Sequence, residues 1–153
     1  MSDDLRDLYQ DLILDHSKHP RNFAKPGQVN HEALGHNPLC GDRLALYLYV
    51  DDGNIIRDIG FQGSGCAISV ASASMMTEML KGKPVQEAEH LFDYMHAACT
   101  GGETNDATID EDARDRIEAL AGVRHYPMRV KCATLPWHTL QAALKDEQKV
   151  STE

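Results

Sequence analysis

One cysteine in this chain has the setting of a reactive or metal-binding thiol. Cys66 follows a glycine-rich stretch, residues 60–65, and precedes a run of small residues, 67–74, that predicts a helix. The glycines let the backbone turn sharply and approach a ligand closely. A thiol at a helix N-terminus feels the positive end of the helix dipole, which favours the thiolate. Thiolate is the form that binds metals or attacks sulfur, so we predict a functional role for Cys66 rather than simple burial.

Two further cysteines have comparable settings. Cys40 lies in the turn-forming segment 37–42, which also contains Asp42. Cys132 lies where we expect the last helix to begin. A β-turn alone would also explain Asp42, and burial alone would explain either cysteine. Taken jointly, cysteines at the ends of three elements favour a site, and we predict that Cys40, Asp42, Cys66 and Cys132 bind one metal ion.

Zinc is the ion that this ligand set fits, because it accepts carboxylate oxygen beside thiolates and closes a tetrahedron with four ligands. Four anionic ligands exceed the charge of a dication, so the site needs nearby cations or N–H donors. Arg129 and Lys131 flank Cys132 and are our candidates, the alternative being a solvated basic pair. His36 and His138 lie close in sequence to ligand cysteines and could replace one of them.

The fourth cysteine is expected to belong to the core. Cys99 shares an apolar helical stripe with Phe92 and Met95, and a free cysteine is most often a small buried hydrophobe. His16 and His19 lie at the end of a surface helix, and we expect both to be exposed to solvent.

Length and composition are those of an ordinary globular protein. The 153 residues, 42% hydrophobic and 25% charged, indicate a single domain, 1–153, with one core and frayed residues after position 145. The formal net charge of −9 argues against nucleic acid as a partner. No apolar run is long enough to cross a membrane, and the first residues lack the basic start of a signal peptide. We therefore expect a cytoplasmic protein whose cysteines form no disulfides.

The elements that must position these residues can be read from periodicity. Alternating apolar residues predict strands over 44–50 and 55–61, joined by a turn at 51–54, with a third strand near 29–34. Antiparallel pairing of the first two strands would bring Cys40 and Cys66 to the same end of the sheet. Helical spacing predicts about five helices: one ending near Pro20, one from 67 to about 80, one from 85, one from Asp110 to Gly122, and a last one with Pro136 in its early turns. The predicted class is α+β, with helices packed on a small antiparallel sheet of about three strands.

Three segments, 37–42, 63–74 and 130–137, resemble the iron–sulfur assembly proteins of the IscU/NifU N-terminal type, and most closely the SufU branch. The resemblance covers nearly the whole chain and implies the α+β fold of that family. It also implies that Cys40, Cys66 and Cys132 are the family's three cysteines and Asp42 its aspartate.

Two departures from the IscU pattern point to the SufU branch. Lys131 stands where IscU-type scaffolds have a histidine, and extra sequence at roughly 99–124 separates the second and third cysteines. The resemblance implies a zinc site and a protein that accepts persulfide sulfur from a SufS-like, PLP-dependent cysteine desulfurase, for delivery to the iron–sulfur assembly machinery or apo-protein acceptors. We expect Cys40 to be the acceptor, because a turn moves more easily than a helix start.

Two alternatives remain open. The same four residues could assemble and transfer a transient [2Fe–2S] cluster, as a scaffold does. The chain could also be a structural zinc domain without sulfur chemistry, in which case it would stimulate no desulfurase.

Overall fold

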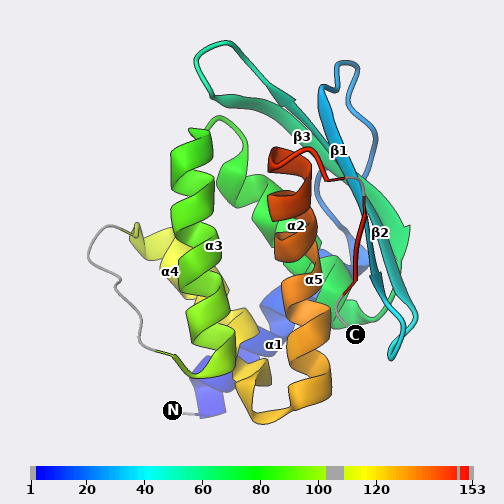
Figure 1. Cartoon of the computed structure of the whole chain (residues 1–153). Coiled ribbons are helices and arrows are strands. Elements are labelled where there is room, and N and C mark those ends of the chain that lie inside the picture. The colour runs from blue at the N-terminus through cyan, green and yellow to red at the C-terminus, as the bar shows by residue number, and fades with distance from the viewer. Residues whose placement is uncertain (1–2, 103–108, 148, 152–153) are drawn as a thin grey trace.

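The computed structural model describes residues 3–102, 109–147 and 149–151. Figure 1 shows a sheet on one side of the molecule and a layer of helices covering one of its faces. The elements follow in the order α1, β1, β2, β3, α2, α3, α4, a short 3-10 helix, α5 and β4. The α+β class predicted from the sequence is confirmed. Part of the polar segment predicted at 100–107 falls outside the described residues.

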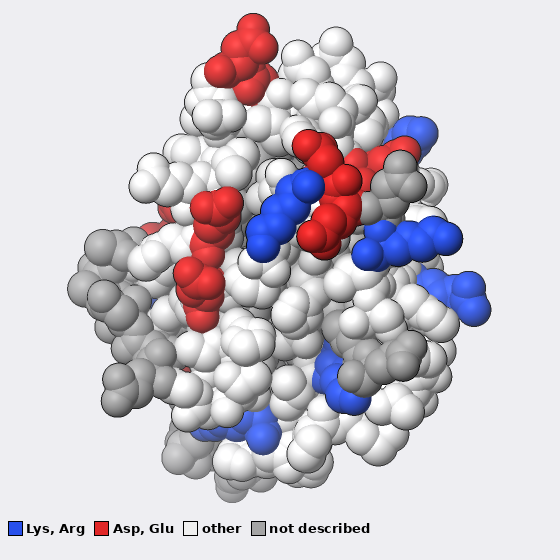
Figure 2. All heavy atoms as spheres, in the orientation of Figure 1, with Lys and Arg blue, Asp and Glu red and all other residues white. Residues whose placement is uncertain are grey.

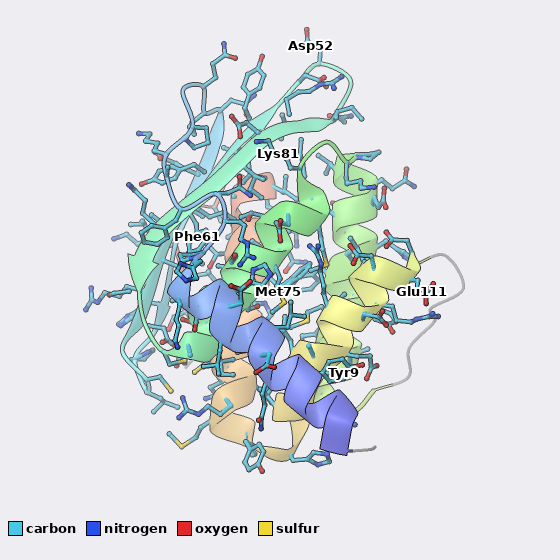
Figure 3. The ribbon with its side chains drawn as sticks, turned by 180° about the vertical axis from the view of Figure 1, so that it is seen from behind. Tyr9, Asp52, Phe61, Met75, Lys81 and Glu111 are labelled. Carbon is cyan, nitrogen blue, oxygen red and sulfur yellow. The ribbon has the colours of Figure 1, made fainter. Side chains whose placement is uncertain are left out.

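The sheet has the strand order β3-β2-β1-β4. Its long strands are β1 (His31–Asn37), β2 (Asp42–Val50) and β3 (Ile56–Ser64), paired antiparallel. Alternate side chains of β2 are buried under the helices, as the period-two pattern predicts. The strand predicted near 29–34 is β1, which begins and ends slightly later than predicted. In Figure 3, Asp52 marks the tip of the turn between β2 and β3.

The register of the sheet fixes where the functional segments lie. Asn37 pairs with Asp42 at the end of the β1–β2 hairpin, and Arg43 pairs with Ser64 at the end of β3. The turn that holds Cys40 and the chain entering α2 therefore meet at one end of the sheet. Antiparallel pairing was the reason for expecting this, and the structure confirms it.

The helices begin and end close to the sequence signals. Their bounds are α1 Asp3–Lys18, α2 Ala67–Leu80, α3 Val85–Thr100, α4 Glu111–Ala121, the 3-10 helix Gly122–His125 and α5 Pro127–Leu144. The side chain of Asp110 accepts a hydrogen bond from the N–H of Ala113 and caps α4, as predicted. Gly101 ends α3 in the left-handed conformation, which glycine adopts without steric cost.

The last helix differs from the prediction. It begins at Pro127, because proline is favoured at the first helical position, where its missing N–H would have no partner anyway. Cys132 therefore lies in the second turn of α5 rather than at its start, and Pro136 lies inside the helix. Proline at 136 cannot donate the hydrogen bond that would close on the carbonyl of Cys132.

A fourth strand was also not predicted. The segment after position 145 was expected to fray, but Lys149–Ser151 forms β4, which pairs parallel with β1 at the sheet edge. Three residues carry little periodicity, so only the tertiary contact with β1 makes this segment a strand.

The core lies between the sheet and the helices. α5 packs on β1 and β2, α2 packs on β3, and α1 covers α2 from outside. Phe61 from β3 and Met75 from α2, both labelled in Figure 3, are fully buried in this layer. In the part of the chain that is described, no helix is long and apolar enough to span a bilayer. Charges of both signs are dispersed over the face seen in Figure 2, so the net negative charge forms no single patch there.

Candidate metal centre

Three of the four predicted ligands meet at the end of the sheet. The donor atoms of Cys40, Asp42 and Cys132 all lie within 4.8 Å of one another. Ligand atoms about 2.3 Å from a tetrahedral zinc ion are roughly 3.8 Å apart, so this spacing suits closure around one ion. Figure 1 shows the β1–β2 turn beside α5 at this end of the molecule. The donor set, two thiols and a carboxylate, is one that zinc accepts.

Cys66 stands beside this group. It is the N-cap residue of α2, so its predicted place at a helix start is confirmed. Its thiol is not one of the three mutually close donors, although it contacts the thiol of Cys132. Its backbone N–H donates a hydrogen bond of 2.8 Å to Oδ1 of Asp42. Cys66 thus holds the aspartate through its backbone, and its thiol lies beside that of Cys132.

Asp42 is held by its surroundings on both oxygens. The carboxylate is fully buried, and its Oδ2 accepts a hydrogen bond of 3.2 Å from the amide of Asn37. A methyl group at Gly65 would overlap Oδ1 of Asp42, so the absence of a side chain there makes room for the carboxylate. The glycine-rich stretch therefore serves the aspartate as well as Cys66.

Cys132 is the most enclosed of the site thiols. It is fully buried, donates a weak hydrogen bond of 3.7 Å to the carbonyl oxygen of Met128, and lies 3.5 Å from the amide nitrogen of Asn37. Burial raises the pKa of the Cys132 thiol, and hydrogen bonds to Cys40, Asp42 and Cys66 raise it further. A bound dication would reverse this preference, because a coordinating thiol is deprotonated outright.

The cation beside the site is Arg129, on the exposed start of α5. The negative charge of Cys66, a hydrogen bond to Cys132 and the charges of Cys132 and Cys40 raise the pKa of the Arg129 guanidinium. Arg129 thus lies near the site thiols, and its supporting role stays a prediction. Lys131 lies half-buried on the same helix, and its role as a second supporting cation stays a prediction.

The other cysteine behaves as a core residue. Cys99 is fully buried on α3, with its thiol 3.8 Å from the sulfur of Met95. Burial raises the pKa of the Cys99 thiol to about 12, which keeps it protonated and unreactive at neutral pH. The prediction of a packing role for Cys99 agrees with this environment.

The positions of three histidines differ from those suggested by the sequence. Among the described residues, neither His36 nor His138 joins the group of close donors. His138 instead stacks edge-on with Phe92 and His96 between α3 and α5. The expectation that His16 is exposed is wrong: it is 2% exposed and lies 2.7 Å from the hydroxyl of Ser74. A helix-end position suggested exposure, but α2 packs over that face of α1.

One residue at the site was missed by the sequence reasoning. The sequence indicates only a turn at Asn37, yet its buried side chain contacts Asp42 and Cys132. The signal that could have identified it is its place in the segment 37–42, directly before Pro38 and near Cys40.

The chain matches the family described as NifU-like N terminal domain over residues 8–148. It is 42% identical over 143 residues to the protein named zinc-dependent sulfurtransferase SufU of Bacillus subtilis strain 168, covering 92% of each chain. It is 40% identical over 141 residues to the protein named iron–sulfur cluster assembly scaffold protein IscU of Streptococcus pyogenes serotype M1, covering 92% of this chain and 85% of the other.

Solved structures give the same result. A crystal structure of a putative iron–sulfur cluster assembly scaffold protein for the SUF system, from Fervidobacterium islandicum AW-1, superposes with a TM-score of 0.80 at 37% identity, covering 91% of this chain and 98% of that one. The NifU-like N-terminal protein of Brucella abortus, at 22% identity and a TM-score of 0.78, shares the fold. Because the family match spans residues 8–148 and the relatives share both sequence and fold, the chain belongs to the family of NifU-like N-terminal domains, together with the SufU and IscU proteins of iron–sulfur cluster assembly.

Proposed function

We propose that this protein binds Zn²⁺ through Cys40, Asp42, Cys66 and Cys132 and accepts persulfide sulfur from a PLP-dependent cysteine desulfurase. The observation that carries the proposal is the group of three close donors, two of them fully buried, with a third thiol beside it. The name of the Bacillus subtilis relative, which combines zinc with sulfur transfer, supports it. Lys131 stands where the IscU pattern has a histidine, and the lack of that further ligand favours zinc over a resident cluster.

The chain's own residues divide into a fixed and a movable part. A bound zinc ion would keep the thiols deprotonated and hold together the segments that carry them. Asp42 and Cys132 are fully buried and anchored by hydrogen bonds. Cys40 is half-buried in a turn that contains Gly41 in the left-handed conformation. Cys40 is therefore the thiolate that can leave the ligand group and meet the sulfur donor.

The transfer step balances without any oxidant or reductant. The Cys40 thiolate attacks the outer sulfur of the desulfurase persulfide, so an S–S bond forms on Cys40. The S–S bond on the desulfurase breaks at the same time, and its cysteine leaves as a thiolate. Arg129, which is already beside the site thiols, is placed to attract the anionic persulfide.

The test begins with the metal content of the purified protein and continues with desulfurase turnover. We expect stoichiometric zinc, and faster turnover with the zinc-loaded protein than with the zinc-free protein. Cys40→Ala should retain part of the zinc and lose sulfur transfer, whereas Cys99→Ala, at equal zinc loading, should retain both. Iron with sulfide in place of zinc, or inactivity of Cys99→Ala alone, would contradict the proposal.

A second candidate is a scaffold that carries a transient [2Fe–2S] cluster on the same residues. It is favoured by relatives named as IscU scaffolds at 40% and 36% identity. Anaerobic reconstitution distinguishes the two functions, because a scaffold would form a stable cluster and transfer it to an apo-protein. A zinc-dependent sulfur acceptor would form none under the same conditions.

A further inference from the structure

We infer that Asn37 is a positioning residue that clamps Asp42 and Cys132 together, forming the fixed half of the metal site. The inference deepens the proposed function and rests on it for the identity of the ligands. Asn37 does not bind the metal in this proposal. It acts through two ligands that come from different elements.

The contacts of the Asn37 amide carry the argument. Its side chain is fully buried at the end of β1. The Nδ2 group has two N–H bonds, and it donates to Oδ2 of Asp42 at 3.2 Å and to Sγ of Cys132 at 3.5 Å. Asp42 begins β2 and Cys132 lies on α5, so one amide links the sheet to the helix at the site. Both acceptors carry negative charge when they bind a cation, which strengthens both hydrogen bonds.

The amide oxygen of Asn37 argues against a role in packing alone. Its Oδ1 is buried and accepts no hydrogen bond from the described residues. A buried acceptor without a donor costs free energy, which an apolar side chain of the same shape would avoid. Packing at the end of β1 therefore does not explain an asparagine. The two N–H groups of the amide explain the asparagine, because each donates a hydrogen bond to a buried ligand that would otherwise have one donor fewer.

The clamp also separates the ligands into two classes. Asp42 is held by Asn37 on one oxygen and by the N–H of Cys66 on the other, and Cys132 is held by Asn37. The hydrogen bonds of the described residues include none between Asn37 and Cys40, which lies in the β1–β2 turn. Loss of the clamp would loosen the buried pair and remove the difference in mobility between it and Cys40.

The test compares Asn37→Ala and Asn37→Leu with Asn30→Ala, a control at an exposed asparagine. The Asn30 amide donates to the carbonyl of Val50 at 2.7 Å and accepts the N–H of Val50 at 2.9 Å, so its printed side-chain hydrogen bonds go to backbone and to no predicted ligand. Zinc affinity is measured by competition with a chelator, and the site geometry by the visible and charge-transfer absorption of the Co²⁺-substituted protein. Asn37→Leu keeps the volume of the side chain and removes the N–H donors. It therefore tests the donors even if the alanine variant lowers the stability of the metal-free protein.

We expect both Asn37 variants to bind zinc about 10- to 100-fold more weakly, as for other residues that orient metal ligands. The Co²⁺ absorption should shift in position or intensity in both variants. Asn30→Ala should lower the unfolding midpoint and leave the zinc affinity and the Co²⁺ spectrum unchanged. Because these readouts require no sulfur transfer, they are independent of the desulfurase assay.

The proposal is overturned if both Asn37 variants bind zinc within about threefold of the parent protein with the same Co²⁺ spectrum. It is also overturned if Asn30→Ala weakens zinc binding as much, since the effect would then follow stability alone. Failure of the proposed function has a different signature. It would appear in the unsubstituted protein, as absence of zinc or of any effect on desulfurase turnover.

Discussion

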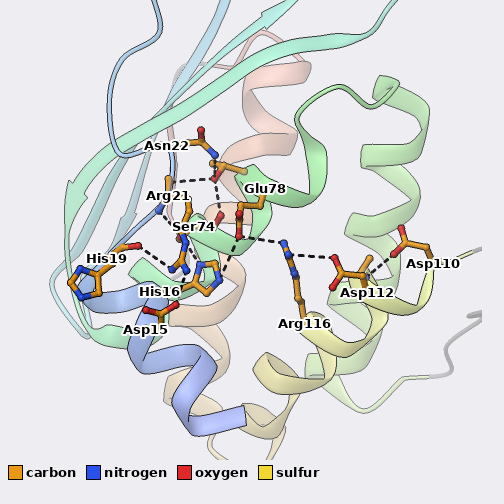
Figure 4. Close-up of polar contacts among 12 residues, drawn as sticks. Asp15, His16, His19, Arg21, Asn22, Ser74, Glu78, Asp110, Asp112 and Arg116 are labelled. Atoms are coloured by element: carbon orange, nitrogen blue, oxygen red, sulfur yellow. Dashed lines mark hydrogen bonds and ion pairs between the residues drawn. The ribbon is translucent and has the colours of Figure 1, made fainter. Parts of the chain in front are cut away.

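Two polar clusters with buried members lie at α2, and they are completed in different ways. The first, which we term the α1–α2 cluster, consists of His16, Ser74, Glu78 and Arg116 (Figure 4). The second is the metal group at the start of the same helix. In the first cluster, hydrogen-bond donors are paired with acceptors, and the Arg116 cation is paired with the Glu78 carboxylate. In the second, acidic groups crowd together, and their main cation, Arg129, lies on the exposed side.

The α1–α2 cluster is satisfied by the chain itself. Ser74 Oγ accepts the N–H of Arg21 at 2.8 Å and lies 2.7 Å from Nδ1 of His16. A neutral ring with its proton on Nε2 then faces Glu78 at 3.6 Å, and Arg116 balances the carboxylate at 3.4 Å. Nothing further is required, so this cluster has a structural role and ties α1 to α2.

The metal group is not satisfied in this way. It keeps a fully buried carboxylate, a fully buried thiol and an amide oxygen that has no hydrogen-bond partner among the described residues. Adding a cation would turn the crowded acidic groups into ligands. A polar cluster therefore indicates a function when its own residues leave the charges unbalanced, and polarity alone does not.

The strongest test of this difference uses two fully buried cysteines. Cys132→Ala should abolish tight zinc binding and lower stability severely, because structural zinc contributes on the order of 10 kcal/mol linked to folding. Cys99→Ala should retain zinc and lose about 1 kcal/mol of packing. Metal analysis and thermal unfolding of both variants measure this, and similar losses in the two would remove the distinction between site and core.

The α1–α2 cluster should affect stability without affecting metal. We expect His16→Ala to lower the free energy of unfolding by about 2 kcal/mol, because it leaves buried Ser74 short of a partner and opens a cavity. Zinc affinity should not change. His19→Ala, at an exposed position, is the control and should stay within about 0.5 kcal/mol. Urea unfolding and a chelator titration provide the two readouts, and zinc loss in His16→Ala would show that the clusters are coupled.

Gly65 tests the seating of the carboxylate. In Gly65→Ala the new methyl group would overlap Asp42 Oδ1 and displace the carboxylate. We expect zinc affinity to fall about tenfold, roughly 1.4 kcal/mol, in the range for groups that orient ligands. Gly122→Ala, where a methyl group would meet no atom within 4 Å, is the matched control. Equal affinities in the two variants would mean that Asp42 can move without cost.

The smallest effect concerns pH. Burial is the main cause that lowers the pKa of His16, helped by the charge of Arg21 and opposed by Glu78. The folded protein therefore keeps His16 neutral where the unfolded chain takes up a proton, below about pH 6.5. The stability due to His16 is complete above that pH and is lost as the pH falls towards the lowered folded-state pKa. Its slope is at most about 1.4 kcal/mol per pH unit.

Urea unfolding at about pH 7.5 and about pH 5.5 checks this sign. The drop in stability should be smaller in His16→Gln than in the parent protein at the same zinc saturation, so that acid release of metal contributes equally to both. His138, whose pKa burial also lowers, would account for an acid-side slope that remains. An unchanged slope in His16→Gln would show that His16 is not the titrating group.

Local patterns in the sequence were sufficient for the elements and for part of the site. Period-two alternation fixed β2, and helix boundaries followed Pro20, Gly82 and Asp110, because these signals act within a few residues. Hairpin pairing then required Cys40 and Cys66 to share one end of the sheet. The residue types Cys, Asp and Gly in the segments 37–42 and 63–74 also carried the family resemblance.

The tertiary structure alone decided the rest. It brought Cys132 of α5 to Asp42 of β2, buried His16 beneath α2, and made a strand of residues 149–151. The role of Asn37 is of the same kind, since its partners lie 5 and 95 residues away in the chain. Contacts between distant segments depend on how elements pack, and no periodicity within one element encodes them. Residue types and local spacing thus identify the side chains that could bind a metal, and packing decides which of them meet and what holds them.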